Sequence, residues 1–189
     1  IGGIAGYNFG TISQCTVLNS DISGKNQSTT AGGAVYVAGI VAANNTGGTI
    51  KSCTVENSTI TGTNENKASQ NLVGGIAADN IVGTIEQCKV INGSVSTSGS
   101  MEVSSVGGIA GCSDGTLKDC SNSSSVEGTN ILKDPENVPG FGSGGVVGCN
   151  KHLVERCSNT GSVTGHGSFT GGVVGYNTTN NTTDGTISF

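Results

Sequence analysis

Apolar residues along the chain follow the two-residue period of short β-strands. Cys53 and Val55 are two residues apart, and the same pair recurs as Cys15 and Val17. No window places apolar residues at i, i+3, i+4 and i+7, and the helix formers Ala, Leu, Glu and Lys are scarce beside Thr, Val and Ile. The pattern therefore predicts an all-β protein.

The two-residue period is interrupted once in each segment of this kind. Ile50 lies three residues before Cys53, so one straight strand cannot point both side chains inward. The two residues between them are therefore expected to form a corner. Each unit is predicted to contain three short strands separated by turns.

A glycine-rich motif, Gly-Gly-aliphatic-aliphatic-small, recurs six times, with repeats that begin near residues 2, 38, 74, 107, 144 and 171. Its second glycine falls at positions 3, 39, 75, 108, 145 and 172, so the steps are 36, 36, 33, 37 and 27 residues. A period of this length indicates one supersecondary unit per repeat, stacked in a solenoid. Residues 1–189 are predicted to form a single right-handed parallel β-helix (β-solenoid), with about one three-strand rung per 33–37-residue repeat.

Charged residues at the predicted corners support stacking in register. If equivalent positions of successive rungs are neighbours, like charges should avoid each other there. The first corner column alternates in sign: Ser13, Lys51, Glu86, Lys118 and Glu155. In the second column, Asp119 is adjacent to Arg156.

The composition excludes several classes of protein. With 33 glycines in 189 residues and 4% aromatic residues, the core is too thin for an ordinary compact enzyme. A net charge of −5 with Arg156 as the single arginine provides no basic stripe, so no nucleic acid is expected as a partner. No apolar run approaches the roughly 20 residues that span a bilayer, so no membrane insertion is expected in this segment. The chain starts at Ile1 without an initiator Met or signal peptide, and we expect it to be a piece of a longer protein.

The sequence Gly-Gly-aliphatic-aliphatic-Gly-x-Asn, followed by Gly-Thr-Ile-x-x-Cys, resembles the GLUG repeat of large bacterial surface and adhesin-like proteins. It matches best at residues 2–15, whereas the second copy has Ala38 and Ala42 in place of glycines and the sixth lacks a cysteine block. The Asn position is filled in five copies and becomes serine in the fourth: Asn8, Asn44, Asn80, Ser113, Asn150 and Asn177. The resemblance implies a secreted or surface-attached β-solenoid, and the family has no catalytic residues to transfer.

Seven cysteines form two columns. The larger column is predicted to be a structural ladder of buried thiols: Cys15, Cys53, Cys88, Cys120 and Cys157. Disulfides between stacked neighbours need Cβ atoms about 3.8 Å apart, closer than relaxed rungs. The second column holds Cys112 and Cys149, each eight residues before a ladder cysteine. If disulfides form, the expected pairs are Cys112 with Cys120 and Cys149 with Cys157. No Cys-x-x-Cys motif is present, so no metal is expected.

Asn-x-Ser/Thr sequons mark candidate glycosylation sites at Asn26, Asn44, Asn57, Asn92, Asn122, Asn177, Asn180 and Asn181. In a chain so rich in Asn, Ser and Thr, several arise by chance. Asn57, Asn92 and Asn122 also match Asn19 and Asn159 of other copies, at the turn before the last strand. There an asparagine ladder bonding to the turn backbone is the alternative interpretation.

The most variable segments all precede the next glycine motif: Lys25–Ala31, Asn64–Gln70, Ser100–Ser104 and Ile131–Phe141. Insertions that collect at one point of each repeat emerge on one face of a solenoid, commonly the binding face. The favoured function is a non-catalytic structural or adhesive segment of an extracellular surface protein, a rigid spacer or scaffold without cofactors. Its expected partner is a host or matrix protein or a glycan.

Two other functions remain open. A carbohydrate-binding or carbohydrate-acting β-helix would use acidic residues such as Asp119 or Glu155, although no nucleophile motif or phosphate loop is present. A self-stacking subunit of an extracellular fibre would associate through unpaired strand edges at the solenoid ends.

Overall fold

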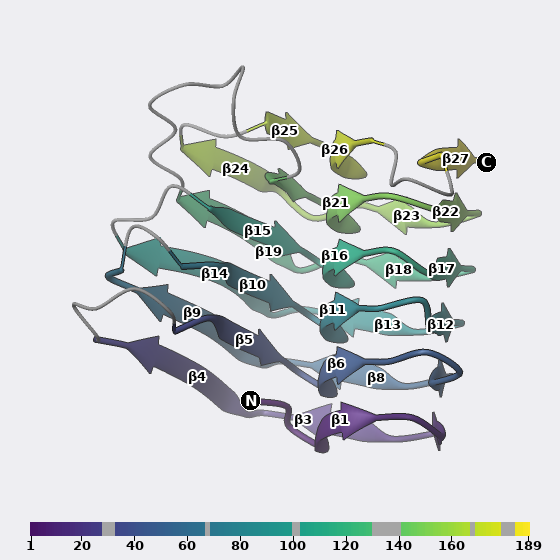
Figure 1. Cartoon of the computed structure of the whole chain (residues 1–189). Coiled ribbons are helices and arrows are strands. Elements are labelled where there is room, and N and C mark those ends of the chain that lie inside the picture. Colours follow the sequence, from purple (N-terminus) through teal and green to yellow (C-terminus); the bar gives the residue numbers. More distant parts are fainter. Residues whose placement is uncertain (28–32, 67–68, 100–102, 130–140, 167–168, 179–183) are drawn as a thin grey trace.

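A computed structural model shows a parallel β-solenoid, with a repeat of about 36 residues and no helix (Figure 1). The structure describes residues 1–27, 33–66, 69–99, 103–129, 141–166, 169–178 and 184–189. A search of these residues for a helix that could span a bilayer found none.

The strands form five parallel sheets, numbered here in chain order; each of the first five repeats contributes one strand to every sheet, and the sixth contributes β26 and β27 to the first and second. The first sheet comprises β1 (Ala5–Asn8), β6 (Val41–Asn44), β11 (Ala77–Asn80), β16 (Ala110–Ser113), β21 (Val147–Asn150) and β26 (Val174–Asn177). The second sheet comprises β2 (Thr11–Ser13), β7 (Thr49–Lys51), β12 (Thr84–Glu86), β17 (Thr116–Lys118), β22 (Leu153–Glu155) and β27 (Thr186–Ser188). The third sheet comprises β3 (Thr16–Leu18), β8 (Thr54–Glu56), β13 (Lys89–Ile91), β18 (Ser121–Asn122) and β23 (Ser158–Asn159).

The last two sheets complete each turn of the solenoid. The fourth sheet comprises β4 (Asp21–Asn26), β9 (Thr59–Asn64), β14 (Ser94–Gly99), β19 (Ser125–Thr129) and β24 (Val163–His166). The fifth sheet comprises β5 (Val35–Ala38), β10 (Asn71–Gly74), β15 (Ser104–Gly107), β20 (Gly142–Gly144) and β25 (Phe169–Gly171). The sequence-based expectation of three strands per repeat is therefore corrected to five.

Two causes account for the additional strands. The predicted corner divides what was counted as one strand into β7 and β8, because Ser52 adopts a left-handed conformation with φ of 52°. The same left-handed turn recurs at the equivalent residue of the other repeats, with φ between 47° and 57°: Gln14, Gln87, Asp119 and Arg156. The fifth sheet was not anticipated, because no strand was assigned to the residues between the variable segments and the next glycine motif.

The core is built from ladders of identical or similar residues, one per repeat. Ile50, Ile85 and Leu117 occupy equivalent positions of the second sheet, and all three are fully buried. The anchor glycines allow the bend between the fifth and first sheets to pass close to this core. A Cβ at Gly75 would lie 2.0 Å from the carbonyl oxygen of Gly108 and 2.6 Å from Cγ2 of Val90. Glycine is therefore required at this position for steric reasons.

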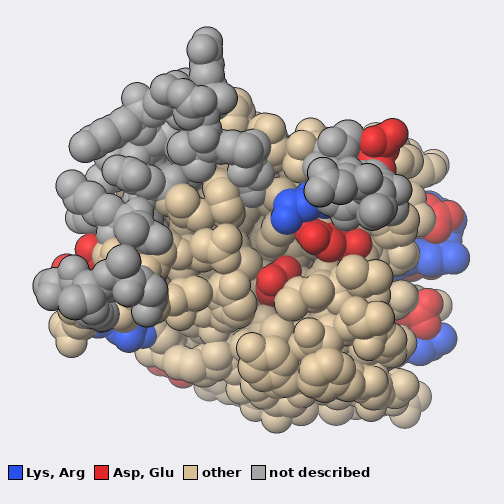
Figure 2. Space-filling view, in the orientation of Figure 1, with Lys and Arg blue, Asp and Glu red and all other residues tan. Residues whose placement is uncertain are grey.

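Register is in phase along the stack, as the charge alternation at the first corner predicted. Glu86 pairs with Lys51 on one side and Lys118 on the other. The Lys51 ammonium lies 2.7 Å from Glu86, and Arg156 Nε lies 2.7 Å from Asp119 Oδ1 in the second corner column. Acidic and basic groups gather on the edge of the molecule formed by the second-sheet strands (Figures 1 and 2).

All the variable segments lie between a strand of the fourth sheet and the next strand of the fifth, and the strand ends that flank them lie along one edge of the solenoid (Figure 1). The segment Asn64–Gln70 joins β9 to β10, and Ile131–Phe141 lies between β19 and β20. Parts of these segments, including most of Ile131–Phe141, lie outside the described residues. The prediction that insertions share one edge of the stack is confirmed by the order of the strands.

Candidate functional site

The outward faces of the first and fifth sheets meet in a second apolar cluster, separate from the main core. This outer cluster consists of Ala38, Leu72, Ala78, Cys112 and Cys149, with Tyr36, Phe141 and Tyr176 packed against it. Alternation within the strands produces it: Val35 and Val37 of β5 point into the core, whereas Tyr36 between them points outward. In the middle repeats both faces of these sheets are therefore covered.

Three charged groups border the outer cluster. Lys151 Nζ lies 3.1 Å from Asp114 Oδ1, and both side chains are 30% exposed. Asp79 is register partner to Ala43 on one side and Cys112 on the other. Burial raises the pKa of Asp79 to about 6, and the nearby Asp114 carboxylate adds to the rise while Lys151 opposes it. The cluster thus contains a carboxyl group that titrates near neutral pH.

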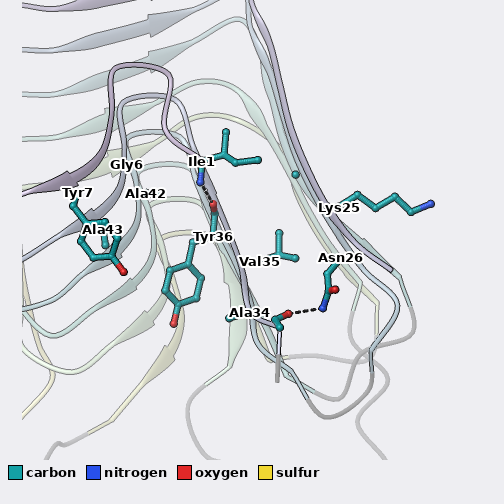
Figure 3. A pocket seen from close by; sticks show the side chains of 12 residues that line it. Ile1, Gly6, Tyr7, Lys25, Asn26, Ala34, Val35, Tyr36, Ala42 and Ala43 are labelled. Atoms are coloured by element: carbon teal, nitrogen blue, oxygen red, sulfur yellow. Dashed lines mark hydrogen bonds between the residues drawn. The ribbon is translucent and has the colours of Figure 1, made fainter. Parts of the chain in front are cut away.

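A hollow of about 530 Å³ opens at the first two repeats, where the same two sheets meet (Figure 3). Tyr7 and Tyr36 lie together on one side of it, and Lys25 extends away from them. Asn26 Nδ2 donates a hydrogen bond to the carbonyl oxygen of Gly33 (2.5 Å). Aromatic rings beside amide and ammonium groups can bind a polar ligand such as a sugar through stacking and hydrogen bonds.

The cysteine ladder is placed as predicted. Cys53, Cys88, Cys120 and Cys157 are buried in the main core, whereas Cys15 at the first level is partly exposed. Each buried thiol donates to the carbonyl oxygen two residues before it, for example Cys53 to Lys51 (3.3 Å). Burial raises the pKa of Cys53 to about 11, so this thiol is protonated and unreactive at neutral pH.

The predicted disulfide pairs are not formed, because all seven cysteines are free. Cys112 and Cys149 belong to the outer cluster, whereas Cys120 and Cys157 belong to the main core. In each expected pair, one cysteine side chain therefore lies on the inward face of the solenoid wall and the other on its outward face. The eight-residue spacing in sequence gave no information about which face each side chain occupies.

Asparagines at the carboxyl ends of the first-sheet strands form a buried ladder. Asn8 Nδ2 donates to Asn44 Oδ1 and Asn44 Nδ2 to Asn80 Oδ1, both at 2.8 Å, and Asn80 Nδ2 donates to Ser113 Oγ at 3.0 Å. The amide of Asn150 donates in the same way to Asn177. Each asparagine also donates to a carbonyl oxygen of the following turn, as Asn44 does to Gly48 (3.2 Å). This ladder ties each glycine turn to its strand.

Asn122 and Asn159 occupy a different position from the one expected. Asn122 pairs in register with Val90, in the inward column that holds Val17 and Val55 in earlier repeats. Its amide donates to Asn159 Oδ1 (2.9 Å) and to the carbonyl oxygen of Ser124 (3.0 Å). The two residues therefore bond to the turn backbone, as expected, but from inside the solenoid.

Burial divides the candidate glycosylation sites. Asn44 is fully buried and Asn122 is 2% exposed, so neither can carry a glycan in the folded chain. Asn57 and Asn92 are exposed, and both have left-handed backbones in the turn between the third and fourth sheets. Asn26 is half-buried and Asn177 is exposed. Asn180 and Asn181 lie outside the described residues.

The acidic residues considered for carbohydrate chemistry lie in the corner ladder. Arg156 hydrogen bonds to Asp119 and lowers the pKa of that carboxyl group. Glu155 contacts Arg156 and lies 3.8 Å from Lys118 Nζ. Within the described ranges, no group of three His, Cys, Asp or Glu residues is arranged to hold a metal ion.

Sequence reasoning missed the outer cluster and the hollow beside it. The signal was present in the column that follows each glycine motif, where Tyr7, Asp79, Cys112, Cys149 and Tyr176 share one position. Such varied residues at one position of a regular repeat indicate that the position is not needed to hold the repeats together.

Comparison of the chain with models of known families, with curated proteins and with solved structures found no match.

Proposed function

We propose that this chain is a non-catalytic structural and adhesive segment of an extracellular surface protein, related to GLUG-repeat proteins. The observation that carries the proposal is the division of each repeat into a constant and a variable part. The five strands recur in register through the stack, whereas the variable segments all follow fourth-sheet strands, whose ends lie along one edge. A regular stack with variable loops on one edge suits a rigid spacer that presents binding segments.

The internal construction supports a role as a spacer. Buried columns of Ile, Val, Cys and Asn link every repeat to the next, through apolar contacts and amide hydrogen bonds. Repeats joined in this way transmit force along the stack because each contacts its neighbours over its whole cross-section. On this proposal the partner is a host or matrix protein or a glycan, contacted at the variable edge.

The hollow at the first two repeats favours a glycan as one class of partner. It lies between the fifth and first sheets, and Lys25 and Asn26 belong to the first variable segment. The exposed Tyr7 ring offers a stacking surface, and the exposed Lys25 ammonium, 3.4 Å from Glu65, offers hydrogen-bond donors at the rim. Recognition of a sugar here needs no catalytic group.

Binding to an immobilised panel of matrix proteins and glycans tests the adhesive role. The variable-edge variant replaces residues 131–140 with a short Gly-Ser linker and carries Tyr36→Ala. The matched control carries Lys51→Ala and Glu86→Ala in the corner ladder, on a different edge of the stack. We expect the variable-edge variant to lose binding at least tenfold and the control to retain it.

Circular dichroism must show both variants folded, and light scattering separates ligand binding from self-association. The adhesive role is contradicted if no panel member binds the unmodified chain. It is equally contradicted if the corner variant loses binding and the variable-edge variant does not.

A further inference from the structure

Cys112 and Cys149 are neighbours in adjacent strands. They are register partners of β16 and β21, one level apart in the first sheet, and both side chains lie in the outer cluster. A hydrogen bond from the Cys149 side chain, together with burial, raises the pKa of the Cys112 thiol well above its usual value. The two thiols are thus neighbours on one face of the first sheet.

We propose that Cys112 and Cys149 are a site of reversible oxidation, at which a disulfide forms between the fourth and fifth repeats. Adjacent strands lie about 4.8 Å apart, within the Cα separations of about 4.4–6.8 Å that disulfides span. Cβ atoms in disulfides lie up to about 4.5 Å apart, so closing the bond requires the strands to approach by only a few tenths of an ångström. Two stacked cysteines can therefore form a disulfide where no other contact fixes the positions of their sulfur atoms.

The outer pair differs from the ladder cysteines in its surroundings. Ladder thiols are enclosed in the main core, and their sulfur atoms donate to backbone carbonyl oxygens. Cys112 and Cys149 lie on the outward face of the first sheet, with Cys112 5% exposed and Cys149 fully buried, so the difference from the ladder is the face they occupy and not their exposure. The column also isolates the pair, because the next residues along it are Asp79 below Cys112 and Tyr176 above Cys149. Each outer thiol therefore has a single cysteine neighbour in the first sheet.

The oxidant is a small-molecule disulfide such as oxidised glutathione. The Cys112 thiol first loses its proton, a step that its raised pKa slows at neutral pH and that alkaline pH favours. The resulting thiolate attacks one sulfur of that disulfide, forming a mixed disulfide and releasing one glutathione thiol. The Cys149 thiol then loses its proton and attacks the Cys112 sulfur, and the second glutathione leaves as a thiol. The protein gives up two electrons and two protons, and the small disulfide is reduced to two thiols.

The test treats the folded, reduced chain with excess oxidised glutathione, blocks remaining thiols in denaturant and maps the peptides by mass spectrometry. We expect a cross-linked peptide pair containing Cys112 and Cys149, and a fall in blocked thiols from seven to five. The ladder cysteines in the same sample serve as internal controls and should all remain blocked. The Cys112→Ala and Cys149→Ala variants should give no cross-link, and alanine fits this column because Ala43 occupies it in the second repeat.

Thermal unfolding gives an independent readout of the bond. The disulfide would close a loop of about 37 residues, so oxidation should raise the midpoint of the unmodified chain by roughly 5–10 °C and leave the Cys112→Ala variant unchanged. A cross-link between Cys112 and Cys120, a cross-link within the ladder, or two thiols that stay free would each overturn the proposal. A bond that forms without raising the midpoint would overturn its role in joining the repeats. None of these outcomes depends on whether the chain is adhesive.

Discussion

Replacing the anchor glycine Gly75 with alanine should destabilise the solenoid strongly, whereas the same change at Gly172 should not. Both are the second glycine of the recurring motif, but they differ in what covers them. A Cβ at Gly75 would lie 2.0 Å from the Gly108 carbonyl oxygen and 2.6 Å from Val90, whereas at Gly172 no atom lies within 4 Å. The two substitutions therefore isolate the effect of steric overlap between stacked repeats.

The structure gives an estimate of each effect. Overpacking a well-filled site costs about 1–3 kcal/mol, and the value should reach or exceed the upper end at Gly75 because a backbone oxygen, unlike a flexible side chain, cannot rotate away. At Gly172 the change should be close to neutral, or stabilising by about 0.4–1 kcal/mol through the lower entropy of the unfolded chain. Urea unfolding followed by circular dichroism measures both. Equal losses at the two positions would refute the claim that contact with the next repeat dictates glycine here.

Three further predictions concern polar groups. Asn44→Ala should lower the free energy of unfolding by about 2–4 kcal/mol in urea denaturation, since two buried neighbours lose their hydrogen-bond partner; a loss under about 0.5 kcal/mol would contradict the ladder's role. Lys51→Ala and Glu86→Ala should each cost no more than about 1 kcal/mol, because the pair is partly exposed, and high salt should abolish the coupling in a double-mutant cycle. Asp79 has a pKa of about 6 in the folded chain against 3.8 unfolded, so the folded state binds more protons and stability falls as pH rises through this window. The substitution Asp79→Ala should remove this dependence, which lowers the free energy of unfolding of the unmodified chain by up to about 2–3 kcal/mol between pH 4 and 7. Identical plots of unfolding free energy against pH for the two chains would contradict the assignment.

The parts of the fold that repeat as single columns could be predicted from the sequence. Ile50 and Cys53 revealed the corner because their spacing breaks the two-residue period, and the structure places Ser52 there with a positive φ. Lys51 and Glu86 revealed the register because neighbouring rungs place them side by side. Each of these inferences needed only the inward or outward direction of a side chain.

The fifth sheet could not be predicted by the same reasoning. In β5 and β10 most residues are buried on both faces, because the outer cluster covers the side that faces away from the core. A strand covered on both faces shows no alternation of apolar and polar residues. In β20 the strand consists of Gly142, Ser143 and Gly144, which carry no apolar signal at all.

The position of Asn122 was wrong for a different reason. Three residues separate Val90 from Ser94, but only two separate Asn122 from Ser125, although Val90 pairs in register with Asn122 and Ser94 with Ser125. The turn between the third and fourth sheets is thus one residue shorter in the fourth repeat. A one-residue shift moves a side chain from one face of a strand to the other. Aligning the copies by their asparagines concealed that shift.

Limited proteolysis of intact source cells tests the extracellular assignment most directly. Trypsin would be added to unbroken cells, and the released peptides identified by mass spectrometry beside a lysed control. Lys25 is an exposed cleavage site at the variable edge, so peptides ending there serve as reporters. The account predicts that peptides of this chain are released from unbroken cells while cytosolic markers stay inside. Peptides of this chain that appear only after lysis would contradict it.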